Sequence, residues 1–69
     1  MKYISILKTI MKTKNLSQQG LASILGVNQT TVSQWLLGNK KPNFDNILMI
    51  YEKFGITPNE FFGIEDFLL

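Results

Sequence analysis

The 69-residue chain contains no cysteine, no histidine and no arginine. Without cysteine and histidine it offers no disulfide, no thiolate or imidazole metal ligand, and no Cys/His or Ser/His catalytic pair. No apolar run is long enough to span a bilayer, and the amphipathic segment at residues 1–11 lacks the small-residue cleavage site of a signal peptide. We therefore predict a protein that is not an enzyme, uses no metal, cofactor or small-molecule ligand, and does not bind a membrane.

The length of the chain limits the number of domains it can form. A chain of this size can bury only roughly 60% of its unfolded surface, which suffices for one small domain and leaves no room for a separate effector or protease domain. We expect a single domain spanning residues 1–69.

Residues 17–25 have the pattern of a short amphipathic helix. Ser17 is a favourable N-cap residue, and Gly26 suits the position just beyond the helix end, where φ is positive. The apolar residues share one face: Leu21, Ala22 and Leu25. The small side chain of Ala22 would let a second helix cross closely.

That second helix is predicted over Gln29–Leu36, with Asn28 as its N-cap. Its inner face would carry Val32, Trp35 and Leu36, and its outer face Gln29, Thr30, Ser33 and Gln34. Two short helices pivoting on a glycine, with apolar side chains only where they would touch, are typical of a helix-turn-helix. The motif indicates that the chain binds DNA.

Three further helices complete the expected fold. The first covers about residues 2–12. Another starts at the N-cap Asn43, ends at Gly55, and points Ile47, Ile50, Tyr51 and Phe54 inward. The last has Thr57 as N-cap, Pro58 at its first position and Glu60 at its third, which is a capping box, and it ends at Gly63. The tail at residues 64–69 could add one more turn.

The run from Leu16 to Pro42, LSQQGLASILGVNQTTVSQWLLGNKKP, resembles the Cro/repressor (XRE-like) helix-turn-helix family of bacteria and phages. The matching framework residues are Leu21, Ala22, Leu25, Gly26, Val27, Val32 and Trp35, and Gly38 closes the recognition helix as it does in that family. The later segments NFDNILMIYEKFGI and TPNEFF resemble the family's fourth and fifth helices. The resemblance implies an all-α, compact five-helix lambda-repressor-like domain, expected in the bacterial cytoplasm.

The chain departs from the family at one pair of positions. Members often carry an arginine late in the first helix and a glutamate late in the third, and these form an ion pair. The matching residues here are Met11 and Leu36. Because a buried ion pair can be replaced by apolar residues at little or no cost, we predict that Met11 packs against Leu36.

The N-terminal part of the second helix of such a motif enters the major groove. The candidate base-contacting residues are therefore Gln29, Thr30, Ser33 and Gln34. Glutamine can contact adenine with two hydrogen bonds, whereas the usual guanine contact, a bidentate arginine, is unavailable to this chain. The alternative is that these side chains form only a solvated helix face with no role in binding.

Candidate phosphate contacts lie at the two helix starts and in the following loop: Gln18, Asn28, Thr31, Asn39, Lys40 and Lys41. Thr31 could instead support the helix start, and residues 39–41 could be only a soluble turn. The net charge of +2 is low for a nucleic-acid binder and predicts weak non-specific binding at physiological salt.

Specificity would then depend on dimerisation. The run from Ile47 to Tyr51 is wider than one buried stripe, and a chain this small cannot cover all its apolar side chains. Related repressors pair through the C-terminal end of the domain, so the candidate dimerisation residues are Phe62, Ile64, Phe67, Leu68 and Leu69. The alternative is that the tail folds back onto its own core.

The favoured functional hypothesis is a Cro-like or prophage repressor that binds double-stranded DNA as a homodimer at a palindromic operator. The alternative is an interaction protein such as an antitoxin, whose apolar tail binds a toxin and for which DNA binding is secondary. The neighbouring gene would discriminate between them.

Overall fold

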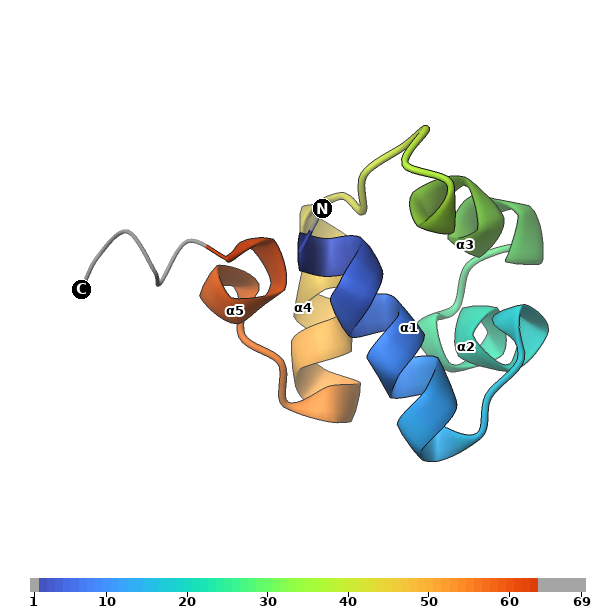
Figure 1. Cartoon of the computed structure of the whole chain (residues 1–69), viewed down its shortest axis with the longest axis horizontal. Coiled ribbons are helices and arrows are strands. Elements are labelled where there is room, and N and C mark those ends of the chain that lie inside the picture. The colour runs from blue at the N-terminus through green and yellow to red at the C-terminus, as the bar shows by residue number, and fades with distance from the viewer. Residues whose placement is uncertain (1, 64–69) are drawn as a thin grey trace.

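The computed structural model describes residues 2–63, and within this range the chain forms five helices: α1 (Lys2–Lys14), α2 (Gln18–Leu25), α3 (Gln29–Leu36), α4 (Phe44–Phe54) and α5 (Pro58–Phe62). Figure 1 shows α2 and α3 at one end of the molecule and α5 at the other, with α1 and α4 between them. The predicted all-α class is confirmed. The possible extra turn in residues 64–69 lies outside the described residues.

Side-chain caps fix the starts of three helices where the sequence predicted them. Ser17 Oγ accepts a hydrogen bond from the N–H of Gly20 at 3.0 Å and so opens α2. The other two starts are capping boxes, in which the N-cap side chain and the third helical side chain each accept from the other's backbone N–H: Asn43 with Asn46, and Thr57 with Glu60. Each box satisfies two backbone donors that the helix itself cannot pair.

The helix ends are set by left-handed residues. Gly26, Gly55 and Gly63 have φ of 70°, 71° and 72° and close α2, α4 and α5 as predicted. The prediction for α1 was wrong by two residues, because the helix continues to Lys14. Asn15 takes the left-handed conformation there, with φ of 55°, and the N–H of Leu16 donates to the carbonyl of Met11 at 2.8 Å. Asparagine tolerates this conformation better than most residues with a side chain.

All five helices contribute to one hydrophobic core. The largest side chains with less than 2% exposure are Trp35, Phe61, Leu7, Leu21, Ile50 and Val32. In α4 the buried residues are Ile47 and Ile50, and Phe54 is half-buried. Tyr51 was expected to point inward, but it is 50% exposed. Tyr51 lies beside the buried residues of α4, outside the surface of α4 that contacts α2 and α5.

Surplus apolar surface remains on this side of α4. Phe44, Leu48 and Tyr51 follow one another at i, i+4 and i+7, so they share one side of α4, and they are 71%, 40% and 50% exposed. We call these three residues the apolar flank of α4. The excess predicted from the run Ile47–Tyr51 therefore exists among the described residues, although Ile47 and Ile50 belong to the core.

Met11 and Leu36 are both half-buried and pack against the core. A charged head at a half-buried position can extend toward water, so Met11→Arg and Leu36→Glu should each cost less than the roughly 3–5 kcal/mol of breaking a fully buried ion pair. We expect about 1–2 kcal/mol for each single change. If the two residues touch, the double variant should recover part of this loss, with a coupling of about 0.5 kcal/mol or more. Urea unfolding of the four proteins measures it, and strictly additive losses would show that the side chains do not interact.

Candidate nucleic-acid interface

The turn between α2 and α3 is built from backbone hydrogen bonds. The N–H of Gly26 donates to the carbonyls of Ala22 and Ser23, and the N–H of Val27 donates to that of Ala22 at 3.0 Å. Asn28 is extended, with φ of −77° and ψ of 151°, and its carbonyl accepts from the first turn of α3. Because Ala22 is almost fully buried and small, α3 packs closely across α2, and the pair forms the predicted helix-turn-helix at one end of the molecule (Figure 1).

The outer face of α3 carries the predicted base-contacting residues. Gln29 and Thr30 are exposed, whereas Ser33 and Gln34 are half-buried. The side-chain oxygen of Gln34 accepts a hydrogen bond from the amide of Asn39 at 3.0 Å. This bond fixes the orientation of the Gln34 amide while leaving its NH₂ group and a second oxygen lone pair free, which are the groups that a bidentate adenine contact uses.

A shallow depression of about 250 Å³ lies between α2 and the start of α3, lined by Gln19, Ala22, Ser23, Val27, Asn28 and Gln29. Gln19 and Ser23 are exposed polar residues on α2, and the sequence prediction missed both. Their spacing of four residues on the outward face of α2 was the available signal. Gln19 and Ser23 continue the polar surface of α3 onto α2, the helix that would lie across the DNA backbone.

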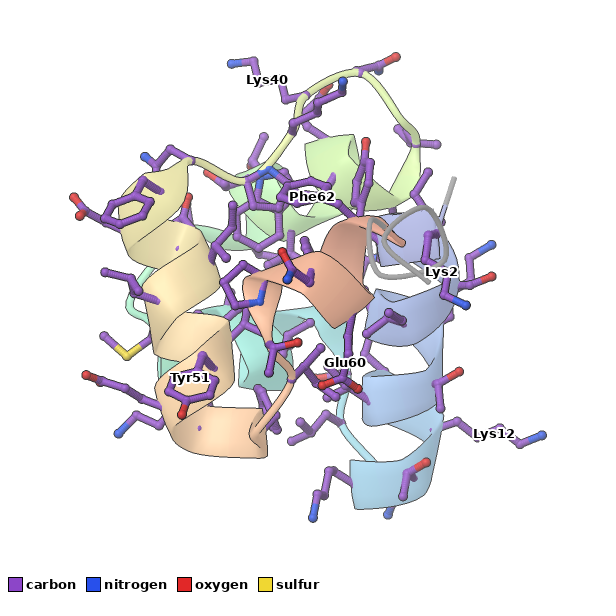
Figure 2. All side chains as sticks on the ribbon, turned by 90° about the vertical axis from the view of Figure 1, so that its left-hand side faces the viewer. Lys2, Lys12, Lys40, Tyr51, Glu60 and Phe62 are labelled. Atoms are coloured by element: carbon purple, nitrogen blue, oxygen red, sulfur yellow. The ribbon has the colours of Figure 1, made fainter. Side chains whose placement is uncertain are left out.

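The predicted phosphate contacts are spread around this surface. Gln18 is the first residue of α2 and is half-buried, as is Thr31 in α3. Asn28 occupies the N-cap position, but its side chain makes no capping hydrogen bond. The predicted side-chain cap was therefore wrong, and the cap leaves the Asn28 amide available to other partners. Lys40 and Lys41 are exposed in the loop before α4, and Figure 2 shows Lys40 extending away from the molecule.

The motif itself is uncharged. No lysine, arginine, aspartate or glutamate occurs between Lys14 and Lys40, so α2, α3 and the turn between them present only neutral hydrogen-bonding groups. Attraction to a polyanion must therefore come from lysines that flank the motif in space.

Within residues 2–63, no three side chains of the types His, Cys, Asp and Glu gather into a group that could hold a metal ion. None of the helices in this range combines the length and apolar character needed to cross a bilayer.

Comparison with known proteins agrees with the geometry. A family model described as helix-turn-helix matches residues 7–61. The chain is 31% identical over 68 residues to the HTH-type transcriptional activator BcrR of Enterococcus faecalis, an alignment that covers 99% of this chain and 33% of BcrR. The chain thus spans about a third of the length of this curated relative. No solved structure matches the chain. The chain belongs to the helix-turn-helix family of DNA-binding transcription regulators, of the Cro/repressor (XRE-like) type that its sequence resembles.

Proposed function

We propose that this helix-turn-helix domain binds a palindromic operator as a homodimer and regulates transcription by occupying it. The observation that carries the proposal is the polar outer face of α3. Gln29 and Thr30 are exposed there, and Ser33 and Gln34 follow one turn later. A hydrogen bond from Asn39 orients the side-chain amide of Gln34. A row of neutral donors and acceptors on the second helix of this motif suits hydrogen bonding to base edges in the major groove.

The direction of regulation has two candidates. Occupation of an operator that overlaps a promoter represses transcription by excluding other proteins from the promoter. The relative BcrR is named a transcriptional activator, which favours activation as the second candidate. A reporter gene with the site placed either over or upstream of the promoter separates the two.

The homodimer is supported by uncovered apolar surface. The apolar flank of α4 is exposed, and Figure 2 shows Tyr51 of this flank from the same side as Phe62 of α5. Phe62 itself is half-buried, with its ring centroid 5.2 Å from that of Phe61 and 6.1 Å from that of Tyr3. It therefore serves its own core as well as any partner. The other predicted dimerisation residues, Ile64, Phe67, Leu68 and Leu69, lie outside the described residues.

Selection of bound duplexes from a random pool tests the proposal. A dimer should enrich sites with two-fold symmetry, whose half-sites are about 34 Å apart, or one turn of DNA. Enrichment of a single asymmetric half-site would contradict the dimer. Failure to enrich any sequence would contradict operator binding.

Gln29→Ala should weaken binding to the selected site by about 1–3 kcal/mol and relax the preference at one base position in each half-site. Gln29 is exposed at the first position of α3, so the substitution should leave the fold intact. Titrations against the selected duplex and a random duplex of equal length provide the comparison. Equal losses on both would show that Gln29 makes no base contact.

A further inference from the structure

A depression of about 230 Å³ lies where the start of α1, the loop before α4 and the end of α5 meet. It is lined by Lys2, Tyr3, Lys41 and Phe62. These residues are far apart in the sequence, and the fold alone brings them together. Two of the four side chains carry positive charge.

Tyr3 contributes a hydrogen-bonding group without a partner. The residue is only 2% exposed, and its ring packs against Phe61 and Phe62 at centroid distances of 5.8 and 6.1 Å. Its hydroxyl has no hydrogen-bond partner among residues 2–63. The hydroxyl oxygen has almost no accessible surface, so it can donate to an acceptor in the depression only after a small side-chain movement opens it. Because a buried hydroxyl left unpaired is destabilising, forming that hydrogen bond would gain free energy.

The two lysines are held by anchored backbone. A methyl group on Gly63 would lie 3.3 Å from Cγ and 3.4 Å from Cβ of Lys2, so the end of α5 packs directly on the Lys2 side chain. The loop that carries Lys41 lies against α1 at Gly38, where a methyl group would lie 3.6 Å from Cδ1 of Ile4, and it is fixed again by the buried Pro42. The stem of Lys2 and the backbone that carries Lys41 are therefore held in place, while the ends of both side chains remain exposed.

The start of α1 adds a partial positive charge, although Lys2 also lines a second depression together with Glu60. The first turn of α1 contains no acidic residue, so nothing there offsets the partial positive charge of a helix N-terminus. Two ammonium groups, one hydroxyl donor and this dipole suit a group with several negatively charged oxygens. We propose that the depression formed by Lys2, Tyr3 and Lys41 binds a phosphate group.

DNA is the source of phosphate that the fold favours, and this part of the inference rests on the proposed function. Lys41 is two residues from Asn39, which hydrogen-bonds to Gln34 of α3. A backbone phosphate beside the groove that α3 would occupy therefore lies within reach of this loop. Because α2 and α3 are uncharged, Lys2 and Lys41 would supply the charge that the motif lacks.

Thermal melts of the whole chain test the anion site without DNA. Inorganic phosphate should raise the melting temperature of the wild type by about 5 °C more than sodium chloride of equal ionic strength, once phosphate exceeds its Kd several-fold. Tyr3→Phe and Lys2→Gln should abolish this difference. Tyr3→Phe should melt no lower than the wild type in chloride, since it removes an unpaired buried hydroxyl. If Tyr3→Phe does not fold, Lys2→Gln and Lys41→Gln decide the question.

Salt dependence of binding to a random duplex tests the source of the phosphate. Lys2→Gln should reduce the slope of log K against log salt by about 0.9, the value for one phosphate contact. The matched control is Lys12→Gln, because Lys12 is also an exposed lysine of α1 but lies at the other end of the helix (Figure 2). It should change neither the slope nor the phosphate response.

The outcomes separate the site from the proposed function. If Lys2→Gln loses the phosphate response but keeps the wild-type slope of log K against log salt, the anion site is supported and its assignment to DNA is overturned. Equal effects of phosphate and chloride on wild-type melting, together with an unchanged slope, overturn the site even if operator binding is specific. If the wild type binds no DNA, the proposed function fails and the melts alone decide the site.

Discussion

Trp35→Ala should destabilise the domain by about 3–5 kcal/mol, the usual cost of truncating a large buried aromatic residue. Trp35 is 1% exposed, lies on the inner face of α3, and is the largest fully buried side chain among the described residues. Because small domains have a total stability of only about 5–15 kcal/mol, the loss should unfold a measurable fraction of the protein near its working temperature. Urea unfolding monitored by circular dichroism measures the change.

Leu37→Ala is the matched control for this variant. Leu37 is two residues further along the chain, at the C-cap of α3, and is 67% exposed. Its truncation should change stability by no more than about 0.5 kcal/mol. A small effect of Trp35→Ala, close to that of the control, would show that α3 is not anchored through this residue. DNA binding by Trp35→Ala should fall in proportion to its unfolded fraction, since the proposed base-contacting face of α3 is unchanged.

The helix-turn-helix and the two helices after it could be predicted from sequence because their signals are local. Ser17, Asn43 and Thr57 cap their helices with their own side chains, and Gly26, Gly55 and Gly63 supply the positive φ that ends them. Each signal depends on residues within one turn, so no knowledge of distant contacts is needed.

The errors have physical causes that a local pattern does not contain. Asn15 ends α1 later than its apolar periodicity implied, because asparagine replaces glycine in the left-handed position. Asn28 has the identity of a capping residue, but its side chain forms no capping hydrogen bond. Tyr51 has helical spacing from Ile47, but no described element covers its side of α4, so it stays half exposed.

The two candidate sites also differ in whether local sequence signals can predict them. The outer residues of α3 follow directly from helix periodicity once Val32 and Trp35 are placed inside. The meeting of Lys2, Tyr3 and Lys41 depends on how α1 and the loop before α4 are placed together. Tyr3 carries only the signal of a buried apolar position, and nothing in the sequence shows that its hydroxyl is unpaired.

The second large predicted effect is the loss of affinity for a full site when the apolar residues beyond Gly63 are removed. If Phe67, Leu68 and Leu69 join two copies, the intact chain should bind a full palindromic site about 10²–10⁴-fold more tightly than a half-site, because the second half-site is then bound at high effective concentration. A variant truncated after Gly63 should lose this gain. It should keep its melting temperature, since Gly63 closes α5 and Phe61 is the last buried core residue within residues 2–63.

A variant with all 69 residues separates the loss of apolar surface from the loss of residues. Phe67→Ser, Leu68→Ser and Leu69→Ser together retain every residue position while removing the apolar surface, and the triple variant should behave like the truncation. A two-fold interface brings the same residues of both copies together and matches the symmetry of a palindromic operator. Sedimentation of the intact and altered chains, free and on full-site and half-site duplexes, measures assembly directly. An intact chain that remains monomeric in solution and on the full site would refute pairing through this segment and leave the exposed flank of α4, Phe44, Leu48 and Tyr51, as the surface to alter next.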